Sequence, residues 1–193
     1  MQCLLFTLFV LAAVADGFSS TQIFGFHNGL GHFPSPTSIG ASTVLENEEP
    51  LSVIFQRAVV LQRSGDHKEA LKEYELFIKA AEQCDVSPVM YAEVHVNIGA
   101  VYVKEKNTGK ARYHFEKALQ HRQVGTAHVN LALLALQQGS KTINPTSGYS
   151  ALKDAKIHCE KAIELNDNEQ SKSAALRLLE DINKILGKMP GGK

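Results

Sequence analysis

The 193-residue sequence contains no tryptophan, only three cysteines, and almost no charge in its first 45 positions. Asp16 is the only acidic or basic residue in that stretch, so all twenty basic residues and all but one of the twenty acidic residues lie from Glu46 onward. The charged part is therefore nearly balanced. Such balance argues against a nucleic-acid-binding stripe, which needs clustered lysine and arginine, and it gives no polybasic signal for a membrane surface.

The amino terminus is an apolar run from Cys3 to Ala15, interrupted only by Thr7. The run is too short to cross a bilayer, which takes about 20 residues. Ala13-Val14-Ala15 has the small-x-small arrangement of a signal-peptide cleavage site. Residues 1–15 are therefore predicted to be a signal peptide that enters the secretory pathway, with an uncleaved anchor as the alternative.

Residues 16–47 have neither a helical nor a strand period, although they contain Phe24, Phe26 and Phe33. This absence predicts a disordered targeting or linker segment. A signal peptide followed by Phe18 and a hydroxyl-rich, acid-poor stretch resembles the bipartite plastid presequences of algae with secondary plastids, and the resemblance implies a plastid destination. The alternative is the linker of a protein in the extracellular space or endomembrane lumen. Both destinations stay open.

One complete repeat motif lies between Ala92 and Gln123. Its key residues, in order, are Asn97, Ile98, Gly99, Tyr102, Ala111, Phe115 and Ala118. This order resembles the tetratricopeptide repeat (TPR), a helix-turn-helix unit of about 34 residues. The resemblance implies that the small residues Gly99 and Ala111 let two helices approach closely, while Tyr102 and Phe115 fill the space between them.

The flanking sequence repeats the motif. Gly65–Leu71 resembles the turn and the start of a second helix, with Tyr74 following. His128–Ala132 echoes His95–Gly99 thirty-three residues later. We therefore predict an all-α fold, a right-handed α-solenoid of three irregular TPR units and a C-terminal capping helix. The predicted domain is 48–187, with units at about 51–91, 92–124 and 125–167, a capping helix at 170–187 and a flexible tail at 188–193.

Three local signals refine these units. The second helix of the first unit is expected to extend through Gln83, and Pro88 marks a stop because the residue before a proline is pushed out of helical geometry. Turn-forming residues in Lys141–Ala151 predict a loop inserted between the two helices of the third unit. From Ser171 to Leu186, apolar residues recur at helical spacing and predict the capping helix, with a dimerisation helix as the alternative.

The family resemblance implies a concave groove lined by the first helix of each unit. Carried over position by position, the predicted groove residues are Phe55, Val59, Val96, Asn97, Ala100, Val103, Val129, Asn130, Leu133 and Leu136, with Gln56 and Gln62 beside them. An apolar groove with a row of amides suits the apolar face of a helix or the backbone of a peptide. Two alternatives are open. The phenylalanine-rich arm or the C-terminal helix could fill the groove, and Asn97 and Asn130 could bond an adjacent repeat.

One known TPR activity is not expected. The clamp that binds acidic chaperone tails uses lysine, arginine and asparagine, but Phe55, Val59, Thr126 and Asn130 stand at four of its five positions. Only Asn97 remains, so a carboxylate would find no cations to form charge-assisted bonds.

Histidines offer the only hint of metal chemistry. His95 and His128 occupy equivalent positions, and His114, His121 and His158 lie on second helices. Zinc ligands must converge within about 2.0–2.3 Å of one ion, whereas equivalent positions in stacked helices lie about 10 Å apart. We therefore interpret them as core residues and expect no metal and no cofactor. Cys84 and Cys159 lie in different units and are not expected to form a disulfide.

The sequence contains no nucleophile elbow, phosphate loop or paired-carboxylate motif, so we do not expect an enzyme. The predicted function is a non-catalytic TPR scaffold or adaptor that binds a protein or peptide segment in its groove during complex assembly. The alternative is a self-plugged or homodimeric helical-repeat protein that binds partners by its outer face. Nucleic acid is not an expected partner, and no membrane span is expected once the signal is removed.

Overall fold

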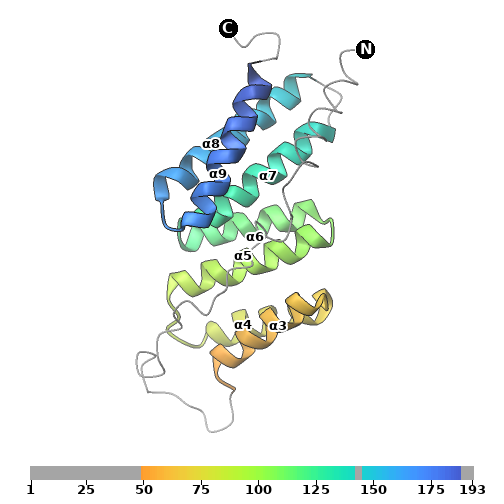
Figure 1. The fold of residues 1–193 in the computed structure, drawn as a ribbon. Helices are drawn as coiled ribbons and strands as arrows, with labels where there is room; N and C mark the ends of the chain where they lie inside the picture. Colours follow the sequence, from red (N-terminus) through yellow and green to blue (C-terminus); the bar gives the residue numbers. More distant parts are fainter. Residues whose placement is uncertain (1–48, 142–144, 188–193) are drawn as a thin grey trace.

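A computed structural model describes residues 49–141 and 145–187. The predicted signal peptide, the segment over 16–47 and the tail over 188–193 lie outside the described residues. Within the described residues the chain is all-α, as predicted, with seven helices and no strand. The helices, labelled in Figure 1, are α3 (Leu51–Ser64), α4 (His67–Ala81), α5 (Pro88–Lys104), α6 (Thr108–His121), α7 (Gly125–Lys141), α8 (Pro145–Leu165) and α9 (Glu169–Leu186).

The helices pack chiefly against their neighbours in the sequence. The largest contacts are those of α3 with α4, α5 with α6, and α7 with α8, while α9 packs against α8 and, less extensively, α7. Smaller contacts of α4 with α5 and of α6 with α7 connect the successive pairs. Figure 1 shows these pairs following one another from α3 and α4 at one end to α7, α8 and α9 at the other.

The turns between helices use the capping chemistry that the sequence offers. Gly65 ends α3 in the left-handed conformation, with φ 87°, which a residue without a side chain adopts at least cost. The side chains of Asp66, Asn107 and Asn168 accept hydrogen bonds from backbone N–H groups in the first turns of α4, α6 and α9. The turn predicted at Gly65-Asp66 is therefore confirmed.

The position of Pro88 explains where α5 begins. Ser87, before Pro88, has an extended backbone with ψ 145°, as its place before a proline predicts. Pro88 itself opens α5, because the first helical position needs no N–H donor. Helix α4 ends at Ala81, two residues before the predicted end at Gln83.

The loop predicted over Lys141–Ala151 is wrong. Helix α7 ends at Lys141 and α8 already begins at Pro145. The residues from Pro145 to Gly148, which were interpreted as turn-forming, therefore belong to α8. Proline is favoured at a first helical position. A Cβ atom added to Gly139 would lie 3.0 Å from the Cβ of Ala151 and 3.6 Å from the carbonyl oxygen of Gly148. The small residues thus let α7 and α8 approach closely, and packing outweighs local turn preference.

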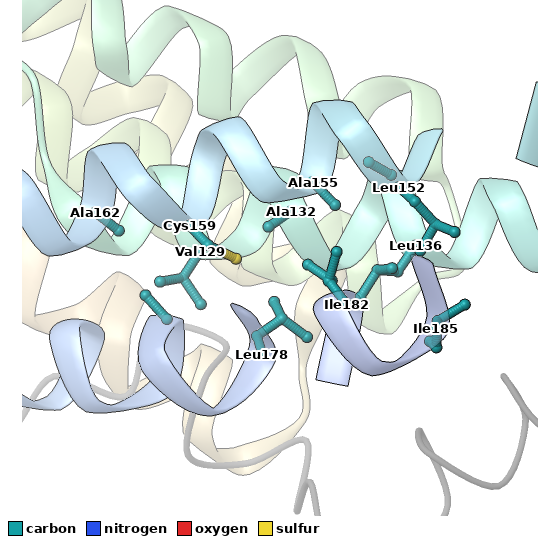
Figure 2. Packing of buried hydrophobic residues seen from close by; sticks show 12 residues of the cluster. Val129, Ala132, Leu136, Leu152, Ala155, Cys159, Ala162, Leu178, Ile182 and Ile185 are labelled. Atoms are coloured by element: carbon teal, nitrogen blue, oxygen red, sulfur yellow. The ribbon is translucent and has the colours of Figure 1, made fainter. Parts of the chain in front are cut away.

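The C-terminal part is tied together by a polar contact and an apolar core. The backbone N–H of Gly125, at the start of α7, donates a hydrogen bond to the Asp167 carboxylate across 3.0 Å. The negative charge of this carboxylate also interacts favourably with the dipole of α7, whose amino-terminal end is positive. Figure 2 shows the apolar core, in which side chains of α7, α8 and α9 pack together. The helix predicted over 170–187 is confirmed as α9, with Leu178, Ile182 and Ile185 buried.

Candidate functional site

Most of the predicted groove residues are buried in the structure. Seven of the ten are almost inaccessible to solvent: Phe55, Val96, Asn97, Ala100, Val129, Asn130 and Leu136. The other three, Val59, Val103 and Leu133, are half-buried. Only these three therefore offer apolar surface to a partner without a rearrangement of the helices.

Neighbouring helices cover the buried groove residues. The Phe55 ring meets the Tyr74 and Phe77 rings edge to face, at centroid distances of 6.1 and 5.9 Å. Val129 and Leu136 of α7 lie in one cluster with residues of α9 such as Ile182 (Figure 2). The C-terminal helix thus lies against part of the surface that the sequence assigned to a ligand.

The amides near this surface differ in their bonding. Gln62 is buried and accepts a hydrogen bond from the Tyr74 hydroxyl across 2.5 Å, whereas Gln56 is exposed. Asn130 is completely buried, and neither its Nδ2 nor its Oδ1 has a partner among the described residues. A buried polar group without a hydrogen bond costs about 1–3 kcal/mol. The unpaired Asn130 amide therefore lowers the stability of the folded domain.

Replacing Asn130 by leucine should raise the free energy of unfolding by about 1 kcal/mol, because an apolar side chain of similar volume removes the unpaired amide. Urea unfolding followed by circular dichroism measures the change. Asn97→Leu is the matched control at the equivalent position of α5, where residual exposure predicts a smaller gain. Destabilisation of Asn130→Leu by more than 1 kcal/mol would instead show that the amide has a partner in solution.

Two pairs of histidines join the first and second helices of successive helix pairs. The Nδ1 atoms of His95 and His114 lie 3.1 Å apart, between α5 and α6, and those of His128 and His158 lie 2.9 Å apart, between α7 and α8. The ring centroids are 5.3 and 5.2 Å apart. In each pair the centroid distance exceeds the Nδ1···Nδ1 distance by roughly twice the distance from an imidazole centroid to its nitrogen. The two nitrogens therefore lie almost on the line between the ring centres and point at each other, as in an N–H···N hydrogen bond.

The surroundings keep these histidines neutral. The pKa values of His95, His114 and His128 are lowered to about 4, chiefly by burial; the partner histidine and nearby lysines contribute for His95 and His128, and Lys110 contributes for His114. The pKa of His158 is also lowered, first by burial and then by Arg112. At neutral pH, one Nδ1–H in each pair therefore donates to the other Nδ1.

The first histidine pair belongs to a longer row of rings along α5 and α6. The His121 ring stacks on Tyr91 at 4.9 Å and on His95 at 5.5 Å, and the His114 ring stacks on Tyr102 at 5.5 Å. His121 is exposed and the row is open to solvent at that end. The sequence contained a signal for both pairs, because His114 and His158 each come directly before a core residue of a second helix, Phe115 and Cys159.

These geometries do not form a metal centre. Head-to-head nitrogens do not converge on a common ion as zinc ligands do, and the described residues contain no group of three or more His, Cys, Asp or Glu that could hold a metal. Cys84 is exposed and Cys159 is buried; both are free thiols, as expected. Burial raises the pKa of the Cys159 thiol to about 12, so it stays protonated.

Comparison with known proteins gives no relative: the sequence matches no protein-family model and no curated protein. Among the residues that the structure describes, no helix is both long enough and apolar enough to span a membrane.

Proposed function

We propose that this protein is a non-catalytic scaffold of the TPR type, a right-handed α-solenoid of three helix pairs closed by α9, that binds a segment of another protein. The contact of Gly99 with Phe115 carries the proposal. A Cβ atom on Gly99 would lie 2.6–2.9 Å from three carbons of the Phe115 ring. Two positions of the repeat signature are thus in contact, which supports the proposal, and Ala111, Phe115 and Ala118 belong to one buried cluster.

The contact surface that we propose consists of three half-buried apolar residues, Val59, Val103 and Leu133, one from each first helix; we call this set the proposed row. An alternative is binding by the outer face. Burial of the other predicted groove residues favours this alternative. So do Tyr113 and Ile157, which are 55% and 51% exposed at equivalent positions of α6 and α8, since exposed apolar residues mark interaction surfaces when they form a patch.

Random peptides displayed on phage, panned against the full-length protein, test both surfaces. Peptides that bind the proposed row should lose about tenfold in affinity, roughly 1.4 kcal/mol, when Val59 and Val103 are both changed to serine. They should bind the Tyr113→Ser, Ile157→Ser variant normally. The reverse pattern would establish the outer face, and enrichment of no peptide would count against a peptide-binding scaffold. Circular dichroism of each variant checks that the helices are retained.

We also propose that the protein enters the secretory pathway, on the basis of the apolar run and of Ala13-Val14-Ala15. Expression with a C-terminal fluorescent tag, followed by sequencing of the mature amino terminus, separates the two destinations. Processing beyond Phe18 with a plastid signal would support assembly of complexes in that organelle. Cleavage after Ala15 with a lumenal signal would support a secreted or endomembrane scaffold, and an intact amino terminus would contradict cleavage.

A further inference from the structure

A second surface of the domain combines rings and cations. We call it the histidine face; it consists of Tyr91, His95 and Tyr102 of α5 and Lys110, His114, Lys117 and His121 of α6. The four α6 residues recur at intervals of four, three and four, so they lie on one side of that helix. The face thus combines residues of both helices of this pair and shares no residue with the set Val59, Val103 and Leu133.

The charges on the histidine face are unbalanced. The charged or titratable groups that act on His95 are His114, His121 and Lys117, and the one that acts on His114 is Lys110. Within residues 49–141 and 145–187, no carboxylate is among them. Glu116 of the same helix lies 3.9 Å from Arg112. Glu82 acts on Tyr91, whose ring stacks on His121, so the face has a carboxylate at that end but none that acts on His95 or His114 among the described residues.

The two lysines of this face contact rings. The Nζ atom of Lys110 lies 5.1 Å from the centroid of Tyr102, and that of Lys117 lies 5.8 Å from the centroid of Tyr113. A cation–π contact at an exposed site stabilises by only about 0.5–1 kcal/mol. Both ammonium groups can therefore turn toward an incoming carboxylate at small cost.

The second histidine pair provides an internal comparison. His128 and His158 also have cationic neighbours, Lys161 and Arg112, but Asp167 acts on His128 and Asp154 acts on His158. Position for position, Asp154 of α8 corresponds to Lys110 of α6, counting back four residues from each histidine. The two pairs thus have similar geometry, but among the described residues carboxylates act only on the histidines of the second pair.

We propose that the histidine face docks an acidic segment of a partner protein, whose carboxylates bind Lys110 and Lys117. A carboxylate placed there favours the charged form of nearby imidazoles, so docking takes up protons from the solvent. The His95–His114 pair can hold one such proton without losing its hydrogen bond, because an imidazolium Nδ1–H donates to a neutral Nδ1. With only two lysines, the face is a poor match for the closely spaced phosphates of nucleic acid.

Fluorescein-labelled hexaglutamate tests this proposal by fluorescence anisotropy with the full-length protein. Binding should tighten as the pH falls from 8 toward 5, because the His95–His114 pair takes up a proton when a carboxylate docks beside it. Lys110→Gln and Lys117→Gln should each weaken binding about threefold or more. Both side chains have exposed or half-exposed positions, so circular dichroism should show folded variants. Lys161→Gln is the matched control at the equivalent position of α8 and should bind as the unmodified protein does.

Three results would overturn the proposal: equal loss of affinity in Lys161→Gln and Lys117→Gln, an affinity that does not change with pH, or displacement of the peptide by single-stranded DNA at a lower concentration than by unlabelled hexaglutamate. The last result would assign the face to nucleic acid. None of these variants changes Val59 or Val103. A negative result with hexaglutamate would therefore count against the histidine face alone, and the peptide-display experiment would decide on the proposed row separately.

Discussion

Acidification from about pH 7.5 to pH 5 should lower the free energy of unfolding by about 3 kcal/mol. This value assumes that one histidine of each pair titrates. The folded-state pKa of His95, His114 and His128 is about 4, below the ordinary value of about 6.5. Between these values the unfolded chain binds more protons than the folded chain. The histidines' contribution is therefore fully present above about pH 6.5 and is lost as the pH falls toward 4.

Urea unfolding at a series of pH values measures this loss. Replacing both members of one pair by glutamine, as in His95→Gln, His114→Gln, keeps a donor and an acceptor but removes the titration. Each such double variant should show about half the pH dependence of the unmodified protein, and the variant with all four replacements should show little. A pH dependence that survives all four replacements would show that other groups cause it.

Gly99→Ala should destabilise the domain by about 3 kcal/mol, at the upper end of overpacking effects. The added Cβ would lie 2.6 Å from a carbon of the Phe115 ring. That ring is completely buried among Ala92, Leu131 and Leu134, so it cannot move away cheaply. The expected result is a lower urea midpoint with an unchanged slope.

Gly109→Ala is the matched control, because a Cβ there meets only the Asn107 Oδ1 at 3.9 Å. Alanine in the first turn of α6 should stabilise by up to about 1 kcal/mol through its helix propensity. Combining Gly99→Ala with Phe115→Leu should cost less than the sum of the two single changes, since the smaller side chain makes room. If Gly99→Ala unfolds no more easily than Gly109→Ala, the close approach of α5 and α6 is not tight in solution.

Features that depend on residues close in sequence were predictable. Gly65-Asp66 predicted a turn, apolar spacing from Ala175 to Ile185 predicted the last helix, and Gly99 predicted a close helix contact; the structure contains all three. Asn144-Pro145 led to the wrong prediction of a loop, because proline can end a helix or begin one. The contact between Gly139 and Gly148 of α8 joins two helices, so local sequence preferences do not predict it.

The histidine pairs and the burial of the groove residues were not predictable for a different reason. In a repeat protein, the sequence draws attention to equivalent positions of successive units, such as His95 and His128. The contact that the structure contains lies instead within one helix pair, between His95 and His114. Likewise, Val129 and Leu136 have the position of groove residues, but the residues of α9 that cover them lie over forty positions further along the chain. The role of Val59, Val103 and Leu133 stays a prediction.

Neighbour-to-neighbour packing has a kinetic consequence. Contacts between residues near in sequence close small loops, so the helical domain should fold quickly and from more than one starting point. Its two ends are unequal, however. Helices α3 and α4 join the remainder mainly through α5, while the other end is fastened by α9 and by the bond from Gly125 to Asp167. The first helix pair should therefore open and reclose as a separate cooperative unit while the remaining helices stay folded.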